Sequence, residues 1–210
     1  MDLRQSFSPT NIALVAVFAG LIAASTIWPG IQLQAGVPVS LQTFSVLLAG
    51  AVLGPWRGAA AVILYLVLGT AGLPIFAQHT GGPAVWLGPT AGFLLGFVLA
   101  AFVTGWIVRR LHRKRLLSLS GIVGACAVGS LLVLNAVGYT WLSVRIGSSP
   151  IDTLVIAIPF LPGDIIKLFL AAVVAYAIHR AYPWILADNR PQEVRDAAPE
   201  PDAEATPASA

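Results

Sequence analysis

Two charged residues, Asp164 and Lys167, lie three positions apart in a stretch of the chain that is otherwise apolar. Of the nine acidic residues, six follow residue 187 and a seventh is Asp2, which leaves Asp152 and Asp164 within the apolar body. Residues three apart share one face of a helix, and a charge at mid-membrane costs about 2.5 to 3.5 kcal/mol. The pair therefore predicts a binding site for a polar ligand. The alternative is a helix cap with a purely structural ion pair.

The residues before this pair predict how it is positioned. Proline is favoured in the first turn of a helix, so a helix that starts at Pro162 places Asp164 in its first turn. A carboxylate there is stabilised by the helix dipole. The apolar segment Ile151–Phe160 is too short to span a membrane, and we expect it to form a half-helix or re-entrant piece.

A second polar cluster, Ser40, Gln42 and Thr43, lies where another apolar segment begins. Their amide and hydroxyl groups suit a neutral polar ring if they face Asp164. The alternative is a helix N-cap at Ser40 with interfacial side chains after it.

A third candidate region is the connection that runs from Gly72 to Thr90. Its glycines, Gly82 among them, allow the backbone to approach a ligand closely, and Phe76 and Trp86 could pack on an apolar ring or chain. Ordinary turn chemistry is the alternative.

The composition identifies the setting of these polar residues. Hydrophobic residues make up 57% of the chain and charged residues 10%, whereas soluble domains average about a quarter charged. We therefore predict an all-α integral membrane protein, with a membrane domain over residues 1–187. A spanning helix needs about 20 mainly apolar residues. About six are expected: 12–28, 41–53, 58–73, 91–108, one within 116–144, and 165–185. A cleaved signal peptide is the alternative for the first, but the later spans need no leader.

The basic residues predict the orientation, because Lys and Arg concentrate on the cytoplasmic side. A cytoplasmic amino terminus places Arg4, Arg57, the cluster Arg109–Arg115 and Arg180 inside, and only Arg145 outside. Both termini are then cytoplasmic, in a multi-pass protein of the bacterial cytoplasmic membrane. Three connections rich in Gly and Pro become outer lid loops: 29–40, 74–89 and 146–162. Residues 188–210, rich in Pro, Ala, Asp and Glu, are predicted to form a disordered cytoplasmic tail.

Several function classes lack their sequence signatures. There is no Gly-x-x-x-x-Gly-Lys-Ser/Thr phosphate loop to power transport, and no Ser-His-Asp, His-Glu-x-x-His or paired-carboxylate arrangement of an enzyme. Cys126 is the only cysteine and His79 lacks a ligand set, so no metal site or other cofactor is predicted. Most basic residues flank apolar segments, which argues against nucleic-acid binding.

Several motifs, taken together and in order, resemble the biotin-specific S components of energy-coupling-factor (ECF) transporters, the BioY family. They are Val37-Pro38-Val39-Ser40-Leu41-Gln42-Thr43, Leu47-Leu48-Ala49-Gly50-Ala51-Val52-Leu53-Gly54-Pro55, Gly72-Leu73-Pro74-Ile75-Phe76 to Gly81-Gly82, Leu87-Gly88-Pro89-Thr90, and Pro159-Phe160 to Asp164-Ile165-Ile166-Lys167. The resemblance spans roughly positions 10 to 185 and excludes the acidic tail. It implies a six-helix subunit that captures biotin at its outer face and works with a membrane-embedded T component and two ATPases.

The resemblance also assigns residues. Asp164 and Lys167 match the family's acidic and basic pair, and Gln42 with Thr43 match its polar second-helix motif. The small residues of the first helix match the face that the family uses toward the T component. Two overlapping patterns fit that face and stay open: Ala16 with Gly20, and Ala19 with Ala23.

Biotin carries a ureido ring with two N–H donors and a carbonyl acceptor, an apolar thioether ring and chain, and a carboxylate. Asp164 could accept from the ureido N–H groups, and Lys167 could donate to the ureido oxygen or keep Asp164 ionised. The predicted apolar wall consists of Phe76, Trp86, Tyr139 and Trp141, and the predicted polar contacts also include Ser40, Gln42, Thr43 and Gly82. Arg145 or loop amides are candidates for the carboxylate. The alternatives are an S component for another vitamin, and a membrane enzyme or assembly subunit.

Overall fold

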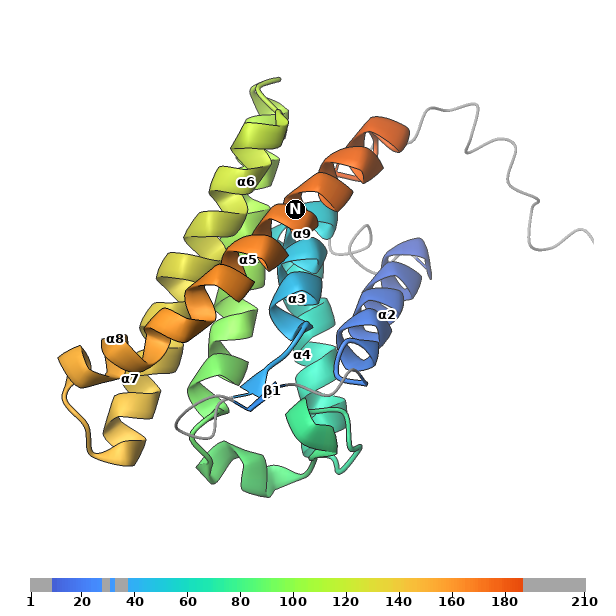
Figure 1. Ribbon diagram of the computed structural model, residues 1–210. Coiled ribbons are helices and arrows are strands. Elements are labelled where there is room, and N and C mark those ends of the chain that lie inside the picture. Colours follow the sequence, from blue (N-terminus) through green and yellow to red (C-terminus); the bar gives the residue numbers. More distant parts are fainter. Residues whose placement is uncertain (1–8, 28–30, 33–37, 187–210) are drawn as a thin grey trace, which may run out of the picture.

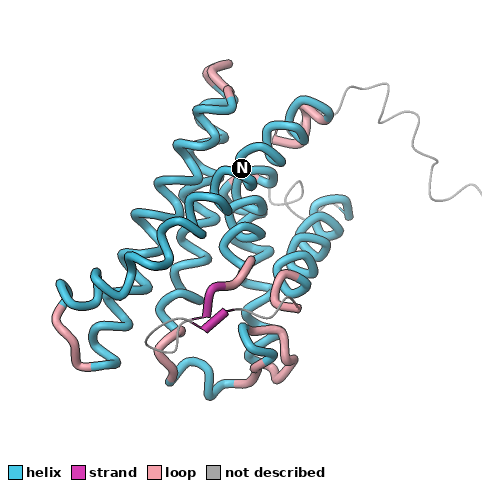
Figure 2. The backbone as a smooth tube through the Cα atoms, viewed as in Figure 1, coloured by secondary structure: helices cyan, strands magenta, loops and turns pink. Residues whose placement is uncertain are grey.

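The computed structural model describes residues 9–27, 31–32 and 38–186. Within that part of the chain, helices pack side by side into one bundle (Figures 1 and 2). The elements are α2 (Pro9–Ala24), β1 (Ile31–Gln32), β2 (Pro38–Val39), α3 (Gln42–Leu53), α4 (Pro55–Thr70), η1 (Ala77–His79), η2 (Pro83–Leu87), α5 (Ala91–Arg113), α6 (Leu119–Ala127), η3 (Val128–Leu134), α7 (Asn135–Ile146), α8 (Pro150–Ala157), η4 (Ile158–Phe160) and α9 (Leu161–Ala181). The predicted tail over residues 188–210 lies outside the described residues.

The described helices group into the six predicted segments. Elements α6, η3 and α7 follow one another without a break, as do α8, η4 and α9, so each trio forms one long segment. The remaining four are α2, α3, α4 and α5. Strands β1 and β2 pair antiparallel, with Ile31 opposite Val39, and depart from the all-helical prediction by two residues each.

Local sequence explains the tight link between α3 and α4. Only Gly54 separates the two helices, and its φ of 80° is a conformation that side chains other than glycine rarely adopt. Pro55 then opens α4, three residues earlier than predicted, because a helix start tolerates the missing N–H of proline. The two predicted spans therefore form a hairpin with a one-residue turn.

The last helical segment is longer than predicted. The stretch Ile151–Phe160, expected to form a separate half-helix, continues into α9 without a loop (Figure 1). A 3-10 turn, η4, contains Pro159 and joins α8 to α9. Pro162 stands in the first turn of α9, where its missing N–H breaks no helical hydrogen bond. Asp164 lies in that first turn, as predicted.

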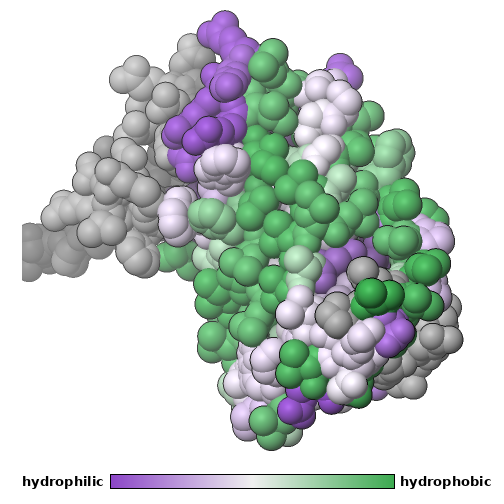
Figure 3. All heavy atoms as spheres, turned by 90° about the vertical axis from the view of Figure 1, so that its left-hand side faces the viewer, coloured by the Kyte–Doolittle hydropathy of each residue, from purple (hydrophilic) through white to green (hydrophobic). Residues whose placement is uncertain are grey.

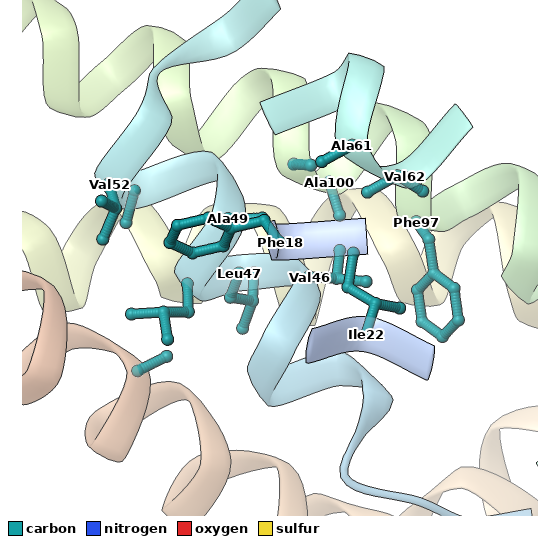
Figure 4. Packing of buried hydrophobic residues seen from close by; sticks show 14 of the residues in the cluster. Phe18, Ile22, Val46, Leu47, Ala49, Val52, Ala61, Val62, Phe97 and Ala100 are labelled. Atoms are coloured by element: carbon teal, nitrogen blue, oxygen red, sulfur yellow. The ribbon is translucent and has the colours of Figure 1, made fainter. Parts of the chain in front are cut away.

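The core is centred on α3, whose residues are almost all buried against α2, α4, α5 and α9 (Figure 4). Glycines let the backbones touch. A Cβ added at Gly50 would collide with the Ala101 carbonyl of α5, and one at Gly58 would lie 2.8 Å from the Gly50 Cα. Close approach of this kind needs small residues at the helix contacts.

The central helix α3 is too short to span the full thickness of a bilayer. The central α3 has 12 residues, or about 18 Å at about 1.5 Å per residue, whereas a bilayer core is about 30 Å thick. Within the described ranges, three segments are long and apolar enough to cross a membrane: Ala91–Arg113, Leu119–Ile146 and Ile151–Ala181. Hydrophobic side chains cover the middle of the face in Figure 3, with hydrophilic ones toward both ends. The short central helix leaves room for a cavity inside the bundle.

Candidate ligand site

A cavity of about 280 Å³ lies at the amino-terminal end of α3. Its volume is close to the lower end of the range for small-molecule sites, about 300 to 1,000 Å³. It is lined by Ser40, Gln42, Thr43, Phe76, Ala77, Gln78, Thr80, Val85, Gly88, Pro89, Thr90, Phe93, Leu94, Phe97, Leu134, Asn135, Tyr139, Phe160, Asp164 and Lys167. The cavity thus joins the first turns of α3 and α9 to the connection between α4 and α5.

The two charged residues singled out by the sequence line this cavity as a pair. Lys167 Nζ lies 3.1 Å from Asp164 Oδ1, and the two side chains are only 10% and 14% exposed. Removing charges from water is costly unless each finds a partner. The pair therefore offers a ligand a fixed carboxylate acceptor and a fixed ammonium donor.

The polar cluster of α3 is held in place by a chain of hydrogen bonds. Ser40 Oγ donates to Gln42 Oε1 over 2.9 Å, and Gln42 Nε2 donates to the Tyr65 hydroxyl over 2.5 Å. The Tyr65 hydroxyl donates in turn to the Ile75 carbonyl over 3.1 Å. Tyr65 itself is fully buried, so this chain fixes the orientation of the Gln42 amide at the cavity wall.

Aromatic side chains form the apolar part of the wall. Phe76 packs edge-on against Tyr65, with ring centroids 5.5 Å apart, and its ring lies over Gly69. Phe93 and Tyr139 form a second edge-on pair at 5.2 Å. Edge-to-face pairs of this kind stabilise the arrangement of the two rings by about 0.5 to 1.5 kcal/mol. The cavity therefore combines charged and amide groups with preformed aromatic surfaces.

We call the connection between α4 and α5 the covering connection. Two of its residues, Gly82 and Trp86, were predicted to contact the ligand but are not part of the cavity lining. They tether that connection to α4. The Gly82 N–H donates to the Gly69 carbonyl over 2.7 Å, and Trp86 Nε1 donates to Thr70 Oγ1 over 2.9 Å.

The candidates Trp141 and Arg145 on α7 also lie outside the lining. Trp141 Nε1 donates to the Gly88 carbonyl over 3.1 Å, and the Arg145 guanidinium donates to the Leu87 carbonyl. The covering connection is therefore fastened to α7 as well as to α4.

Sequence reasoning missed several lining residues, of which Asn135 is the most informative. This amide stands at the start of α7, directly after the π-helical turns of η3. A π-helical insertion rotates the residues that follow it relative to a regular α-helix, and such insertions are frequent at functional sites. Gln78 also lines the cavity and has a φ of 61°, uncommon for a residue other than glycine.

The two small-residue patterns on α2 face different ways. Ala19 is buried and Ala23 is partly buried within the bundle, whereas Ala16 and Gly20 are exposed. A Cβ added at Gly20 would meet nothing within 4 Å. The surface left open by the bundle is thus the one that carries Ala16 and Gly20.

Comparison with known proteins identifies the family. The BioY family model matches residues 2–184. The chain belongs to the BioY family. It is 42% identical over 185 residues to the biotin transporter BioY of Rhodobacter capsulatus, covering 84% of this chain and 96% of the relative. It is 38% identical over 184 residues to the biotin transporter BioY of Rhizobium etli, covering 86% and 98%.

A solved structure shares the architecture. The chain superposes on the S-component for biotin from an ECF-type ABC transporter with a TM-score of 0.78 at 26% identity, covering 86% of this chain and 95% of the other. Membership of the BioY family and this match confirm the predicted class of helical membrane protein.

Proposed function

We propose that this chain is the substrate-binding S component of an ECF transporter and that its substrate is biotin. The observation that carries the proposal is the cavity of a BioY-family fold in which Asp164 and Lys167 stand together, nearly buried, beside Gln42. The chain belongs to transport proteins and not to enzymes.

The chemistry of the cavity suits a ureido ring. The Asp164 carboxylate accepts hydrogen bonds from N–H donors, and the Lys167 ammonium donates to a carbonyl oxygen. In our proposal the ureido group lies against this pair, with Asn135 and Gln42 as further partners. Charge-assisted hydrogen bonds in a dry site are about twice as strong as neutral ones, so the pair dominates recognition.

The thioether ring and the alkyl chain of biotin then pack on the aromatic part of the wall, formed by Phe76, Phe93 and Tyr139. Thr43 and Ser40 complete the polar side of the site. In this proposal Gly82, Trp86 and Arg145 position the covering connection through hydrogen bonds made outside the cavity lining.

Equilibrium binding to the purified subunit tests the proposal. Isothermal titration with biotin, thiamin, riboflavin and folate is expected to give saturable binding of biotin alone. Binding of another vitamin in place of biotin would assign the chain to a different substrate, and binding of none would remove the role as a substrate-binding subunit.

The protein is a multi-pass membrane protein, and we propose that the cavity opens to the outside with both termini in the cytoplasm. Single cysteines at Gly82 and Ser148, near the cavity end, should react with an impermeant maleimide in intact cells. A cysteine at Lys114, at the opposite end, should react only after permeabilisation. The reverse pattern would invert the orientation.

A T component and two ATPases complete the proposed transporter, and we assign the T-component contact to the exposed face of α2. Gly20→Leu and Ala16→Leu should weaken co-purification with a T component and leave biotin binding by the isolated subunit intact. Gly124→Leu on α6 is the matched control, since Gly124 is also exposed and a Cβ added there would meet nothing within 4 Å. Equal loss of assembly in the control would contradict the assignment, as would normal assembly in both α2 variants.

A further inference from the structure

A strongly basic surface lies at the end of the bundle opposite the cavity. We call it the basic cluster: the end of α5 and the turn after it, with Arg109, Arg110, Arg113, Lys114 and Arg115. All but the partly buried Arg109 are exposed, and none of the five has an acidic partner among the described residues. Five positive charges are thus available to a negatively charged partner.

The chain carries a segment of matching charge. From position 196 onward the chain has no Lys or Arg. It has four acidic residues there: Asp196, Glu200, Asp202 and Glu204. This acidic segment, residues 196–210, lies beyond residue 184, where the match to the family model ends.

The fold brings the start of this segment close to the basic cluster. His112 in the last turn of α5 and His179 in the last turn of α9 have ring centroids 6.5 Å apart, so both helices end at the same end of the bundle. Beyond α9, Arg57 Nη2 donates to the Ile185 carbonyl over 2.5 Å, and Leu186 packs near Gly54. The chain therefore leaves the bundle at the same end as the basic cluster.

The intervening length is sufficient to reach it. Asp196 lies ten positions after Leu186, and a random-coil chain of ten residues has an r.m.s. end-to-end distance of roughly 16 to 19 Å. That exceeds the diameter of one helix, about 10 to 12 Å. Tethering at this length corresponds to an effective concentration in the millimolar range, so weak individual ion pairs suffice.

We propose that the acidic segment, residues 196–210, docks on the basic cluster of its own chain. The competing occupants are anionic lipid head groups, which basic clusters beside a membrane helix also attract. We favour the tail because it is covalently attached at the same end of the bundle, whereas a lipid must be recruited. The contact is electrostatic and therefore sensitive to salt. The Debye screening length falls from about 8 Å at physiological ionic strength to about 3 Å at 1 M salt.

A distance measurement on the full chain tests this. Nitroxide labels at Leu116→Cys, beside the cluster, and Ser209→Cys, in the tail, report their separation by pulsed electron resonance in phosphatidylcholine nanodiscs. Native Cys126 is fully buried, which protects it from labelling. The test variant D196N/E200Q/D202N/E204Q neutralises the tail. The matched control permutes residues 196–208 and keeps their charge.

We expect a short-distance population in the wild-type protein and in the permuted control. It should be lost in the neutralised variant and in 1 M salt. Identical distance distributions in wild type and neutralised variant would overturn the proposal. So would displacement of the wild-type tail when phosphatidylglycerol replaces part of the phosphatidylcholine, because lipid would then occupy the cluster.

Discussion

The two ends of the helical bundle are built on different principles. Around Lys167, polar and aromatic side chains surround a cavity and are held by hydrogen bonds and ring contacts. Around Gly50 and Gly105, the backbones of α3, α4 and α5 touch, and a Cβ at Gly105 would lie 2.5 Å from the Gly54 carbonyl carbon. Substitutions at the closely packed end, around Gly50 and Gly105, should therefore mainly lower the stability of the fold. Substitutions at the cavity end, around Lys167, should mainly weaken ligand binding.

The largest effect on stability is expected at Gly50. Gly50→Leu inserts a side chain where the Ala101 backbone already fills the space, and overpacking of this kind costs about 3 kcal/mol when the backbone has to move. Thermal unfolding in detergent should show a strongly lowered melting temperature. Gly124→Leu, which adds the same side chain on an exposed face, should melt like wild type. Wild-type stability of Gly50→Leu would mean that α3 and α5 are not in close contact.

A smaller effect on stability is expected at Tyr65, whose hydroxyl joins the Gln42 side chain at the cavity wall to the Ile75 carbonyl. Tyr65→Phe leaves the Gln42 amide and the Ile75 carbonyl without their partner, and an unsatisfied buried group costs about 1 to 3 kcal/mol. Both the apo melting temperature and biotin affinity should fall. Tyr176→Phe is the control, since that hydroxyl makes no hydrogen bond within the described chain. If biotin affinity does not change in Tyr65→Phe, the orientation of Gln42 does not matter for binding.

The smallest effect is expected at Arg57, far from the cavity. Its guanidinium donates to the Leu53 carbonyl, to Asn11 Oδ1 over 3.0 Å and to the Ile185 carbonyl. The single ammonium group of a lysine cannot reproduce this planar arrangement of donors. Arg57→Lys should lower unfolding stability by about 1 kcal/mol, the typical net value of a hydrogen bond, and leave biotin affinity unchanged. Arg180→Lys, on an exposed residue, is the control. Weakened biotin binding in Arg57→Lys alone would show that the two ends are coupled.

The fold and the charged pair could be predicted from sequence because membranes penalise charge strongly. Asp164 and Lys167 stand out in an apolar segment without any structural knowledge. The covering connection was also predicted, and its Phe76 lines the cavity, whereas Gly82 and Trp86 hold the connection in place through bonds to Gly69 and Thr70. Hydrogen bonds of this kind could not be predicted from the sequence, because they depend on which segments lie next to each other in the folded protein.

Other features were beyond the sequence for geometric reasons. Asn135 is one amide in a long apolar segment, and its position at the cavity follows the π-helical turns of η3, which a search for the α-helical period does not detect. The patterns Ala16 with Gly20 and Ala19 with Ala23 are equivalent in sequence. Only the packing of α2 against its neighbours decides that Ala16 and Gly20 face outward.

The most direct test of the account compares single and double substitutions at the charged pair. Removing one partner leaves a nearly buried charge uncompensated, so Asp164→Asn or Lys167→Met should lower both apo stability and biotin affinity. Removing both charges is often neutral for folding, so the double variant should regain an apo melting temperature close to wild type. Its biotin affinity should stay roughly ten- to a hundredfold lower, the value of a lost charged hydrogen bond of about 1.5 to 3 kcal/mol. Wild-type affinity in a stable double variant would contradict the account, because the pair would then be a structural feature of α9 and not the biotin site.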